Sequence, residues 1–365
     1  MITKVTIDNF RCFTNFELEL GPFHLLLGDN GSGKSTFFDV LSRVGWLLAG
    51  ASVEDCFALT DLTAWDKRTA QDFAVEMSAG DDEFRYELRI EHNLDEATRS
   101  IARERLLWNS QVFYRFEDGQ AHLYGFDGSH VVEGATFPFD SSRSFLPLLP
   151  QRPDNAPLRR FRDSVFGWLC VRLVPPQMEA SSKAESHTIN PDGRNFSSWY
   201  HYLTTAHPEV IVEVTRSLGD VIPGLKHLRF RSIGESKWLE ASFKRMSKDL
   251  AFFQLSDGQR ALVVLYTLLH SIPSLGYSLY IDEPDNYVCL REIQPWLTQL
   301  EDLCGQEGRQ AILISHHPEL INRLAKDYGI WFSRPDDGPV RARKEYPVVD
   351  GLTAAETMAR GWDDE

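Results

Sequence analysis

Cysteine is scarce in this sequence and forms no recognisable pattern. The chain of 365 residues has five cysteines, and no two of them are spaced as Cys-x-x-Cys. An odd, scattered set argues against a disulfide framework and a zinc finger, and favours a reducing compartment. The sequence also lacks an apolar run of about 18 residues, and its N-terminus lacks the apolar core of a signal peptide. We therefore expect a soluble, cytoplasmic protein that does not enter a membrane.

Basic residues are in the minority. The chain has 38 Lys and Arg against 53 Asp and Glu, which gives a formal net charge of −15. Nonspecific DNA binding depends on basic side chains that neutralise phosphates, so the balance excludes a strongly basic nucleic-acid coat but not a local basic groove. Two basic clusters, at residues 159–162 and 341–344, fit either a phosphate contact or a solvated face.

Repeats, low-complexity tracts and heptad runs are also absent, and residues 50–250 are β-rich and broken by Pro and Gly, so we expect no coiled-coil arm. No set of His, Asp and Cys has the spacing of a zinc or dinuclear nuclease site. The sequence does contain α/β patterns at both ends. An apolar run at 23–27 precedes a predicted helix at 34–48, and buried-strand patterns return after residue 254. Between them, residues 70–150 alternate polar and apolar side chains as in antiparallel strands.

The first motif is a glycine-rich loop. Residues 28–35, GDNGSGKS, fit G-x-x-x-x-G-K-[ST] between a predicted strand and a predicted helix, which is the context that the motif requires. Its backbone N–H groups would cradle phosphates, Lys34 would reach the β- and γ-phosphates, and the Ser35 hydroxyl would hold Mg²⁺. The predicted contacts to the nucleotide are Gly28, Asn30, Gly31, Ser32, Gly33, Lys34, Ser35 and Thr36.

Two later strands are predicted to end in polar side chains. The apolar segment 278–281 is followed by Asp282 and Glu283, and the segment 312–315 is followed by His316. Asp282 has the position of a carboxylate that binds Mg²⁺, and Glu283 could orient or deprotonate an attacking water. Without the phosphate loop, the same acids would fit an exposed turn that closes a strand.

A third motif, LSDGQ at residues 255–259, precedes an apolar helical stretch. Ser256 and Gln259 match a capping box, so Ser256 is the predicted N-cap of a helix. Gly258 would allow close approach of the backbone. The segment alone fits an ordinary capped core helix as well as a helix that faces an anion. Its position 26 residues before the acidic strand end favours the anion.

LSDGQ resembles the LSGGQ signature of ABC-type ATPases, with Asp257 in place of a glycine. The order of phosphate loop, signature, Asp-Glu and histidine is similar to that of the ABC, SMC, RecF and OLD-like ATPases. The opening IDNFRCF…LGDNGSGKST resembles the branch of that group labelled AAA rather than the transporters. The resemblance covers about residues 1–50 and 250–335. It implies an α/β fold: a P-loop NTPase core of the ABC type with an inserted antiparallel β lobe and a helical lobe.

This resemblance also implies a domain organisation. Residues 1–175 would form the N-terminal half of the ATPase core, with the β-rich lobe inserted at about 51–150. Residues 176–253 would form the helical and β lobe, and residues 254–365 the C-terminal half of the core. Neither a coiled-coil arm nor a nuclease domain is expected.

In this family two protomers clamp two ATP molecules, which implies a homodimer with ATP at its interface. Ser256 and Gly258 would then face the nucleotide of the partner, and His316 would contact the γ-phosphate as a switch histidine. Gln177, after a Pro pair, is either the glutamine that ligates Mg²⁺ or a polar loop residue. Family members often have His-Pro shortly after Asp-Glu-Pro, whereas this chain has Tyr287 and Val288, so the loop toward the partner is altered.

The resemblance therefore implies an enzyme that hydrolyses ATP to ADP and phosphate with Mg²⁺. Two functions remain open. In the first, an ATP-gated clamp acts in DNA repair or in phage defence, that is, defence against foreign DNA. In the second, the ATPase is a regulatory switch that controls a separate effector protein, such as a nuclease or toxin, without binding DNA. The acidic balance favours the second, and the resemblance favours the first.

Overall fold

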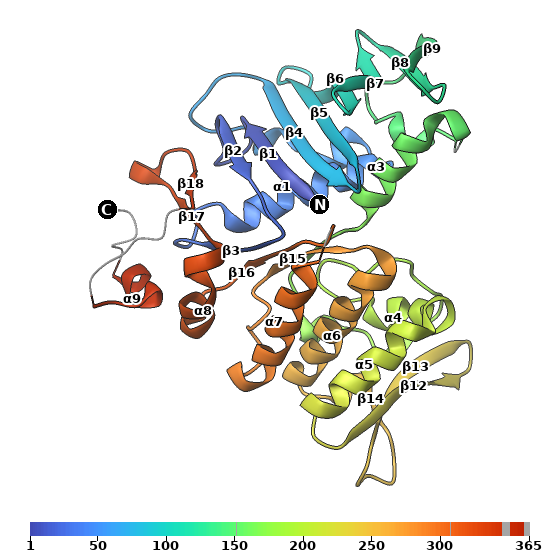
Figure 1. Cartoon of the computed structure of the whole chain (residues 1–365), viewed down its shortest axis with the longest axis vertical. Helices are drawn as coiled ribbons and strands as arrows, with labels where there is room; N and C mark the ends of the chain where they lie inside the picture. Colours follow the sequence, from blue (N-terminus) through green and yellow to red (C-terminus); the bar gives the residue numbers. More distant parts are fainter. Residues whose placement is uncertain (151, 307, 345–350, 361–365) are drawn as a thin grey trace. The chain divides into compact units, whose positions relative to one another are not determined.

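The structure is a computed structural model that describes residues 1–150, 152–306, 308–344 and 351–360. The chain divides into two compact units, Met1–Trp168 with Asn322–Glu365, and Leu169–Ile321 (Figure 1). The first unit therefore draws on both ends of the chain. The expected division of the chain at residues 175 and 253 stays a prediction. Within Leu169–Ile321, the helix of residues 208–221 packs against the helix that begins at Asp257.

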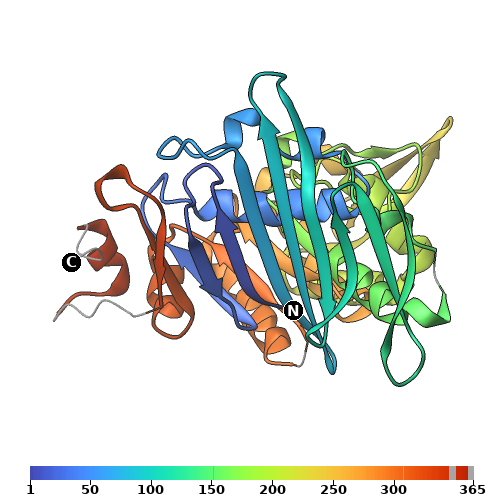
Figure 2. The same cartoon turned by 90° about the horizontal axis from the view of Figure 1, so that it is seen from above.

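A large antiparallel sheet dominates the first unit (Figure 2). Its eight strands run in the order β2-β1-β4-β5-β6-β7-β8-β9, and each hydrogen-bonds to its neighbours. Their bounds are β1 Ile2–Asp8, β2 Phe16–Glu19, β4 Ala70–Ala79, β5 Asp82–Asn93, β6 Thr98–Trp108, β7 Gln111–Glu117, β8 Gln120–Phe126 and β9 Val131–Pro138. Strand β4 alternates buried and half-buried residues, as expected for a sheet with one covered face. The antiparallel region expected at 70–150 is present, and the N-terminal hairpin extends it.

The phosphate-loop elements also belong to the first unit. Strand β3 (Phe23–Leu27) leads into the loop, and helix α1 (Lys34–Leu48) follows it. Strand β17 (Gly329–Ser333) lies parallel to β3, with Gly329 opposite Leu25, and β18 (Arg341–Arg343) lies antiparallel to β17. The remaining elements of this unit are α2 Val53–Cys56, η1 Leu59–Asp61, η2 Leu146–Leu148, η3 Pro153–Asn155, α3 Ala156–Phe166, η6 Pro335–Asp337 and α9 Ala354–Ala359. Helix α1 has the bounds that the sequence predicted.

The second unit contains a parallel pair of strands and several helices. In the pair, β15 (Ser278–Asp282) lies beside β16 (Ala311–Ile314), and Asp282 is opposite Ile314. The other elements are β10 Trp168–Val171, η4 Pro175–Gln177, β11 Ser181–Ser182, α4 Phe196–Ala206, α5 Pro208–Val221, β12 Leu225–Ile233, β13 Ser236–Phe243, β14 Leu250–Ala251, η5 Phe252–Gln254, α6 Asp257–Leu275 and α7 Leu290–Cys304. Helix α8 (Pro318–Tyr328) crosses the boundary between the units. Among the described residues, no helix combines the length and apolarity that a membrane crossing needs.

A buried carboxyl group lies in the core of the large sheet. Glu104 is fully buried, and it accepts hydrogen bonds from the hydroxyls of Tyr86 (2.8 Å), Tyr114 (3.1 Å) and Ser144 (2.6 Å). Three hydroxyl donors satisfy the carboxyl oxygens, but burial raises the pKa of Glu104 above its ordinary value of 4.5. The folded state therefore binds this proton more tightly than the unfolded state.

This difference makes the free energy of unfolding depend on pH. The folded pKa is raised, so the stabilisation is present below pH 4.5 and is lost as the pH rises through the folded pKa. Glu104→Gln keeps the shape of the side chain but cannot ionise, so its free energy of unfolding should not fall in this way as the pH rises. Thermal unfolding at pH 5 and pH 8 checks the prediction. An equal change for the two proteins would contradict it.

Candidate nucleotide site

The phosphate loop connects β3 to α1 and depends on glycine. Gly28, Gly31 and Gly33 have φ of 130°, 81° and 101°, a region that residues with a Cβ rarely adopt. A Cβ on Gly28 would lie 2.0 Å from the carbonyl oxygen of Phe332, and one on Gly33 would lie 2.8 Å from Val340. Nothing lies within 4 Å of the corresponding point at Gly31, so the loop is open there.

Lys34 is buried and turns back into this loop. Its Nζ donates to the carbonyl oxygens of Gly28 (2.7 Å) and Asp29 (2.8 Å) and to Ser32 Oγ (3.3 Å). Helix α1 begins at Lys34 without a side-chain cap and without an acidic residue in its first turn. The positive end of the helix and the ammonium therefore lie at one loop, which is an arrangement suited to an anion. The other predicted contacts are placed as follows: Asn30, Gly31 and Ser35 exposed, Ser32 buried and Thr36 half-buried.

In the second unit, Glu283 follows β15 in a strained conformation. Asp282, the last residue of the strand, is 7% exposed. Glu283 has φ 56°, in the left-handed region, and its N–H donates to the carbonyl of Ile314 at 2.9 Å. A non-glycine residue in this region costs on the order of 1–3 kcal/mol, and such strain is concentrated at functional sites.

His316 and Glu283 lie together within this unit. His316 Nε2 is 3.6 Å from Glu283 Oε1, with exposed side-chain fractions of 39% and 16%. The parallel register of β15 and β16 explains the proximity, because the carboxyl ends of neighbouring parallel strands lie at one edge of the sheet. The structure thus brings together an acid and a histidine that are 33 positions apart in the chain. An arrangement of this kind can orient a water or sense a charge.

The signature segment forms the capping box that the sequence predicted. Ser256 Oγ accepts from the N–H of Gln259 at 3.2 Å, and Gln259 Oε1 accepts from the N–H of Ser256 at 3.1 Å. A Cβ on Gly258 would lie 2.6 Å from the carbonyl oxygen of Tyr287, so packing within the unit requires glycine here. Both residues are placed at the start of α6, and their contact with a partner's nucleotide stays a prediction.

Asp257, which departs from the family signature, forms an ion pair with Arg260 one turn further along α6. A carboxylate in the first turn suits the positive end of the helix but would repel a phosphate. The Arg260 guanidinium offsets that charge. The net charge of this ion pair is close to zero, so the first turn of α6 can contain Asp257 without a net negative charge.

The residues expected to hold Mg²⁺ supply suitable oxygen donors. Mg²⁺ prefers carboxylate, hydroxyl and phosphate oxygens, and Asp282 and Ser35 offer the first two. Asp285 Oδ1 is buried and has no hydrogen-bond partner among the described residues, so an acceptor oxygen is unsatisfied close to Asp282 in the chain. Across the described ranges, no group of three or more His, Cys, Asp and Glu could hold an ion by itself.

Gln177 is exposed at the end of η4 and already has a partner. Its Oε1 accepts a hydrogen bond from an Arg194 guanidinium nitrogen at 2.8 Å. Ligation of Mg²⁺ by this oxygen would require that bond to break. The assignment of Gln177 to the metal therefore stays a prediction, and it would require the loss of the hydrogen bond from Arg194.

Two residues beside the phosphate loop were missed by sequence reasoning. Arg334 follows β17 and donates from Nη1 to the carbonyl oxygen of Gly31 at 3.2 Å. Its Cζ lies 5.4 Å from the centre of the Trp65 ring. Neither residue belongs to a sequence motif, and only the parallel pairing of β17 with β3 brings residue 334 to a loop 303 positions away.

Comparisons with known proteins agree with this fold. The family AAA_21, described as "AAA domain, putative AbiEii toxin, Type IV TA system", matches residues 23–322. A crystal structure of an SMC head bound to the C-winged helix domain of ScpA has a TM-score of 0.57 at 13% identity, over 94% of this chain and 98% of that chain. An SMC head domain from Thermotoga maritima has a TM-score of 0.48 at 13% identity, over 95% and 99%. No curated protein matches the sequence.

At this identity the first structural match shows the fold alone. It confirms the expected α/β class, a P-loop NTPase core of the ABC type with inserted β and helical material. The expected likeness to the ABC and SMC group of AAA ATPases is also confirmed, and the described residues form no coiled-coil arm.

Proposed function

The chain belongs to the AAA_21 family, and from that premise we propose that it is a Mg²⁺-dependent enzyme that hydrolyses ATP to ADP and phosphate as an ATP-gated homodimeric clamp. The phosphate loop carries this proposal. Three left-handed glycines, an uncapped helix start and the inward-turned Lys34 together form a site for a polyphosphate. An ordinary glycine-rich turn would not hold a buried lysine against its own carbonyl oxygens.

Each predicted site residue has a defined role in this proposal. Lys34 leaves its carbonyl partners and donates to the β- and γ-phosphates, while the first N–H groups of α1 hold the phosphate oxygens. Asp282 and Ser35 would hold Mg²⁺, which neutralises developing charge on the phosphates when it is bound. Glu283 orients the attacking water and accepts its proton. His316, 3.6 Å from Glu283, would contact the γ-phosphate and respond to its loss.

The clamp requires a second copy of the chain. Ser256 and Gly258 at the start of α6 would face the nucleotide of the partner, so that two ATP molecules close the dimer and hydrolysis opens it. The Asp257–Arg260 ion pair supports this step because it lowers the repulsion between Asp257 and a phosphate.

Two biological roles fit such a clamp, and the charges favour the control of a protein partner. The net charge is −15, and the basic cluster at 159–162 is partly engaged, with Arg160 paired to Asp82 and Arg162 donating to the carbonyl of Leu149. The similar SMC head is bound to a domain of another protein. We therefore place control of an effector protein, such as a toxin or nuclease, beside the role in DNA repair or phage defence.

Removal of the metal tests the enzyme activity. We expect phosphate release from ATP at neutral pH to fall to background with excess EDTA, and to return when Mg²⁺ is added beyond the chelator. The reason is that Asp282 and Ser35 cannot position the phosphates without the ion. A colorimetric phosphate assay measures this. Phosphate release that EDTA leaves unchanged would overturn the proposed role of Asp282 and Ser35.

A further inference from the structure

Trp65 is an exposed aromatic side chain beside the phosphate loop. It is 45% exposed on the segment between η1 and β4, although a large indole normally buries most of its surface. The guanidinium of Arg334 lies over its ring, 5.4 Å from the centroid. This Trp65–Arg334 pair presents a planar aromatic surface and a planar cation to the solvent.

Arg334 ties this pair to the phosphate loop. One guanidinium nitrogen donates to the carbonyl oxygen of Gly31 at 3.2 Å, and the other two donate to the carbonyls of Gly338 and Asp337, each at 3.0 Å. Asp336 and Asp337 both have left-handed φ, of 52° and 54°. Strain of this kind persists only where surrounding contacts impose it. The guanidinium is therefore held in one place, between the loop and the Trp65 ring.

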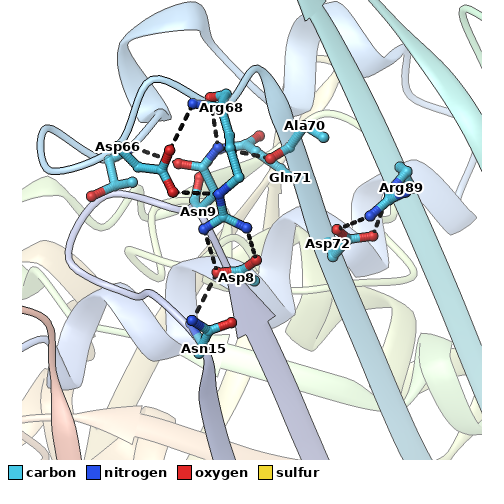
Figure 3. Close-up of polar contacts among 10 residues, drawn as sticks. Asp8, Asn9, Asn15, Asp66, Arg68, Ala70, Gln71, Asp72 and Arg89 are labelled. Atoms are coloured by element: carbon cyan, nitrogen blue, oxygen red, sulfur yellow. Dashed lines mark hydrogen bonds and ion pairs between the residues drawn. The ribbon is translucent and has the colours of Figure 1, made fainter.

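The segment that carries Trp65 is also fixed, through strand β1 (Figure 3). Arg68 forms an ion pair with Asp8 at 2.6 Å, and Asn9 Nδ2 donates to the carbonyl oxygens of Arg68 (2.8 Å) and Ala70 (2.7 Å). The N–H of Trp65 itself donates to Thr63 Oγ1 at 3.3 Å. A surface fixed in this way loses little conformational entropy when a ligand packs against it.

We propose that the Trp65–Arg334 pair is the base-recognition surface of the nucleotide site and accepts the purine ring of a nucleoside triphosphate. This inference rests on the proposed function, because the phosphates are taken to lie in the loop. The loop contacts described here recognise phosphate, and they would hold inorganic tripolyphosphate equally well. Indole and guanidinium planes both stack on a base, and each stacking contact contributes substantially to affinity. The pair is therefore a specificity-determining surface that separates ATP from a bare polyphosphate.

The test compares two ligands on one variant. In Trp65→Ala, we expect the Kd for Mg·ATP to rise about tenfold, since stacking contributes about 1–3 kcal/mol per base. The Kd for tripolyphosphate should not change. Titration calorimetry measures both constants on the full chain.

Trp46→Ala is the matched control. Trp46 is 47% exposed in the same unit, on α1, and lies about 18 Å along the helix from Lys34 at 1.5 Å per residue. It should bind both ligands as the wild type does. If Trp65→Ala binds ATP normally, or loses ATP and tripolyphosphate equally, the base-recognition surface is wrong while the ATPase proposal stands. If the wild type binds neither ligand, both proposals fail together.

Discussion

Glu283→Gln is expected to abolish ATP turnover while ATP binding persists. A positioned general base contributes about 10²–10⁴-fold to a rate, so phosphate release should fall by at least about a hundredfold. Gln keeps the shape and the size of the side chain but cannot accept the proton of the attacking water. Because a bound ATP would then stay intact, the variant should also accumulate as the closed homodimer.

Two measurements separate these effects. Steady-state phosphate release reports turnover, and light scattering with Mg·ATP reports the mass of the particle. Glu235→Gln, at an exposed position in the turn between β12 and β13, removes one carboxylate of the same unit and should behave as the wild type. Wild-type turnover in Glu283→Gln would exclude Glu283 as the base, and a monomer with ATP bound would exclude the clamp.

Lys34→Ala is expected to lose most of the affinity for ATP. Its ammonium is the charged group that the loop itself holds, with three oxygen partners between 2.7 and 3.3 Å. A hydrogen bond to a charged group contributes about 1.5–3 kcal/mol, so the Kd should rise by a factor of about ten to one hundred and fifty. Dimer formation should be lost with it, because no nucleotide remains to close the interface.

Titration calorimetry with Mg·ATP measures this loss. Lys326→Ala, an exposed lysine on α8, changes the net charge equally and should leave the Kd unchanged. Thermal unfolding should show that Lys34→Ala remains folded, since Gly28, Gly31 and Gly33 keep the loop conformation. Equal affinities for Lys34→Ala and the wild type would show that the loop does not bind the phosphates.

Local signals in the sequence predicted much of this molecule. The helix at 34–48 begins at a glycine-rich loop and has apolar residues at helical spacing, so its bounds follow from nearby residues. The capping box of Ser256 and Gln259 is equally local and forms as expected. The likeness of the fold to SMC heads was predictable because the motifs occur in a characteristic order along the chain.

Contacts between distant residues were not predictable. Glu283 has a left-handed φ, and its N–H donates to Ile314 of the neighbouring strand, and no residue near Glu283 in the sequence indicates either feature. The sequence showed only that Asp257 departs from the family signature. It did not indicate the ion pair with Arg260 that offsets the charge of this carboxylate. Gln177 was assigned from its neighbours, and its bond to Arg194 comes from a residue 17 positions away. Arg334 reaches the phosphate loop only through strand pairing.

The most direct test of the central claim is the rate of phosphate release from Mg·ATP by the wild-type chain and by Lys34→Ala, purified side by side. We expect release well above background for the wild type and background release for the variant, because hydrolysis requires the phosphates to lie in the loop. Equal rates for the two proteins, or no release by either, would contradict the conclusion that this chain is an ATPase acting through its phosphate loop.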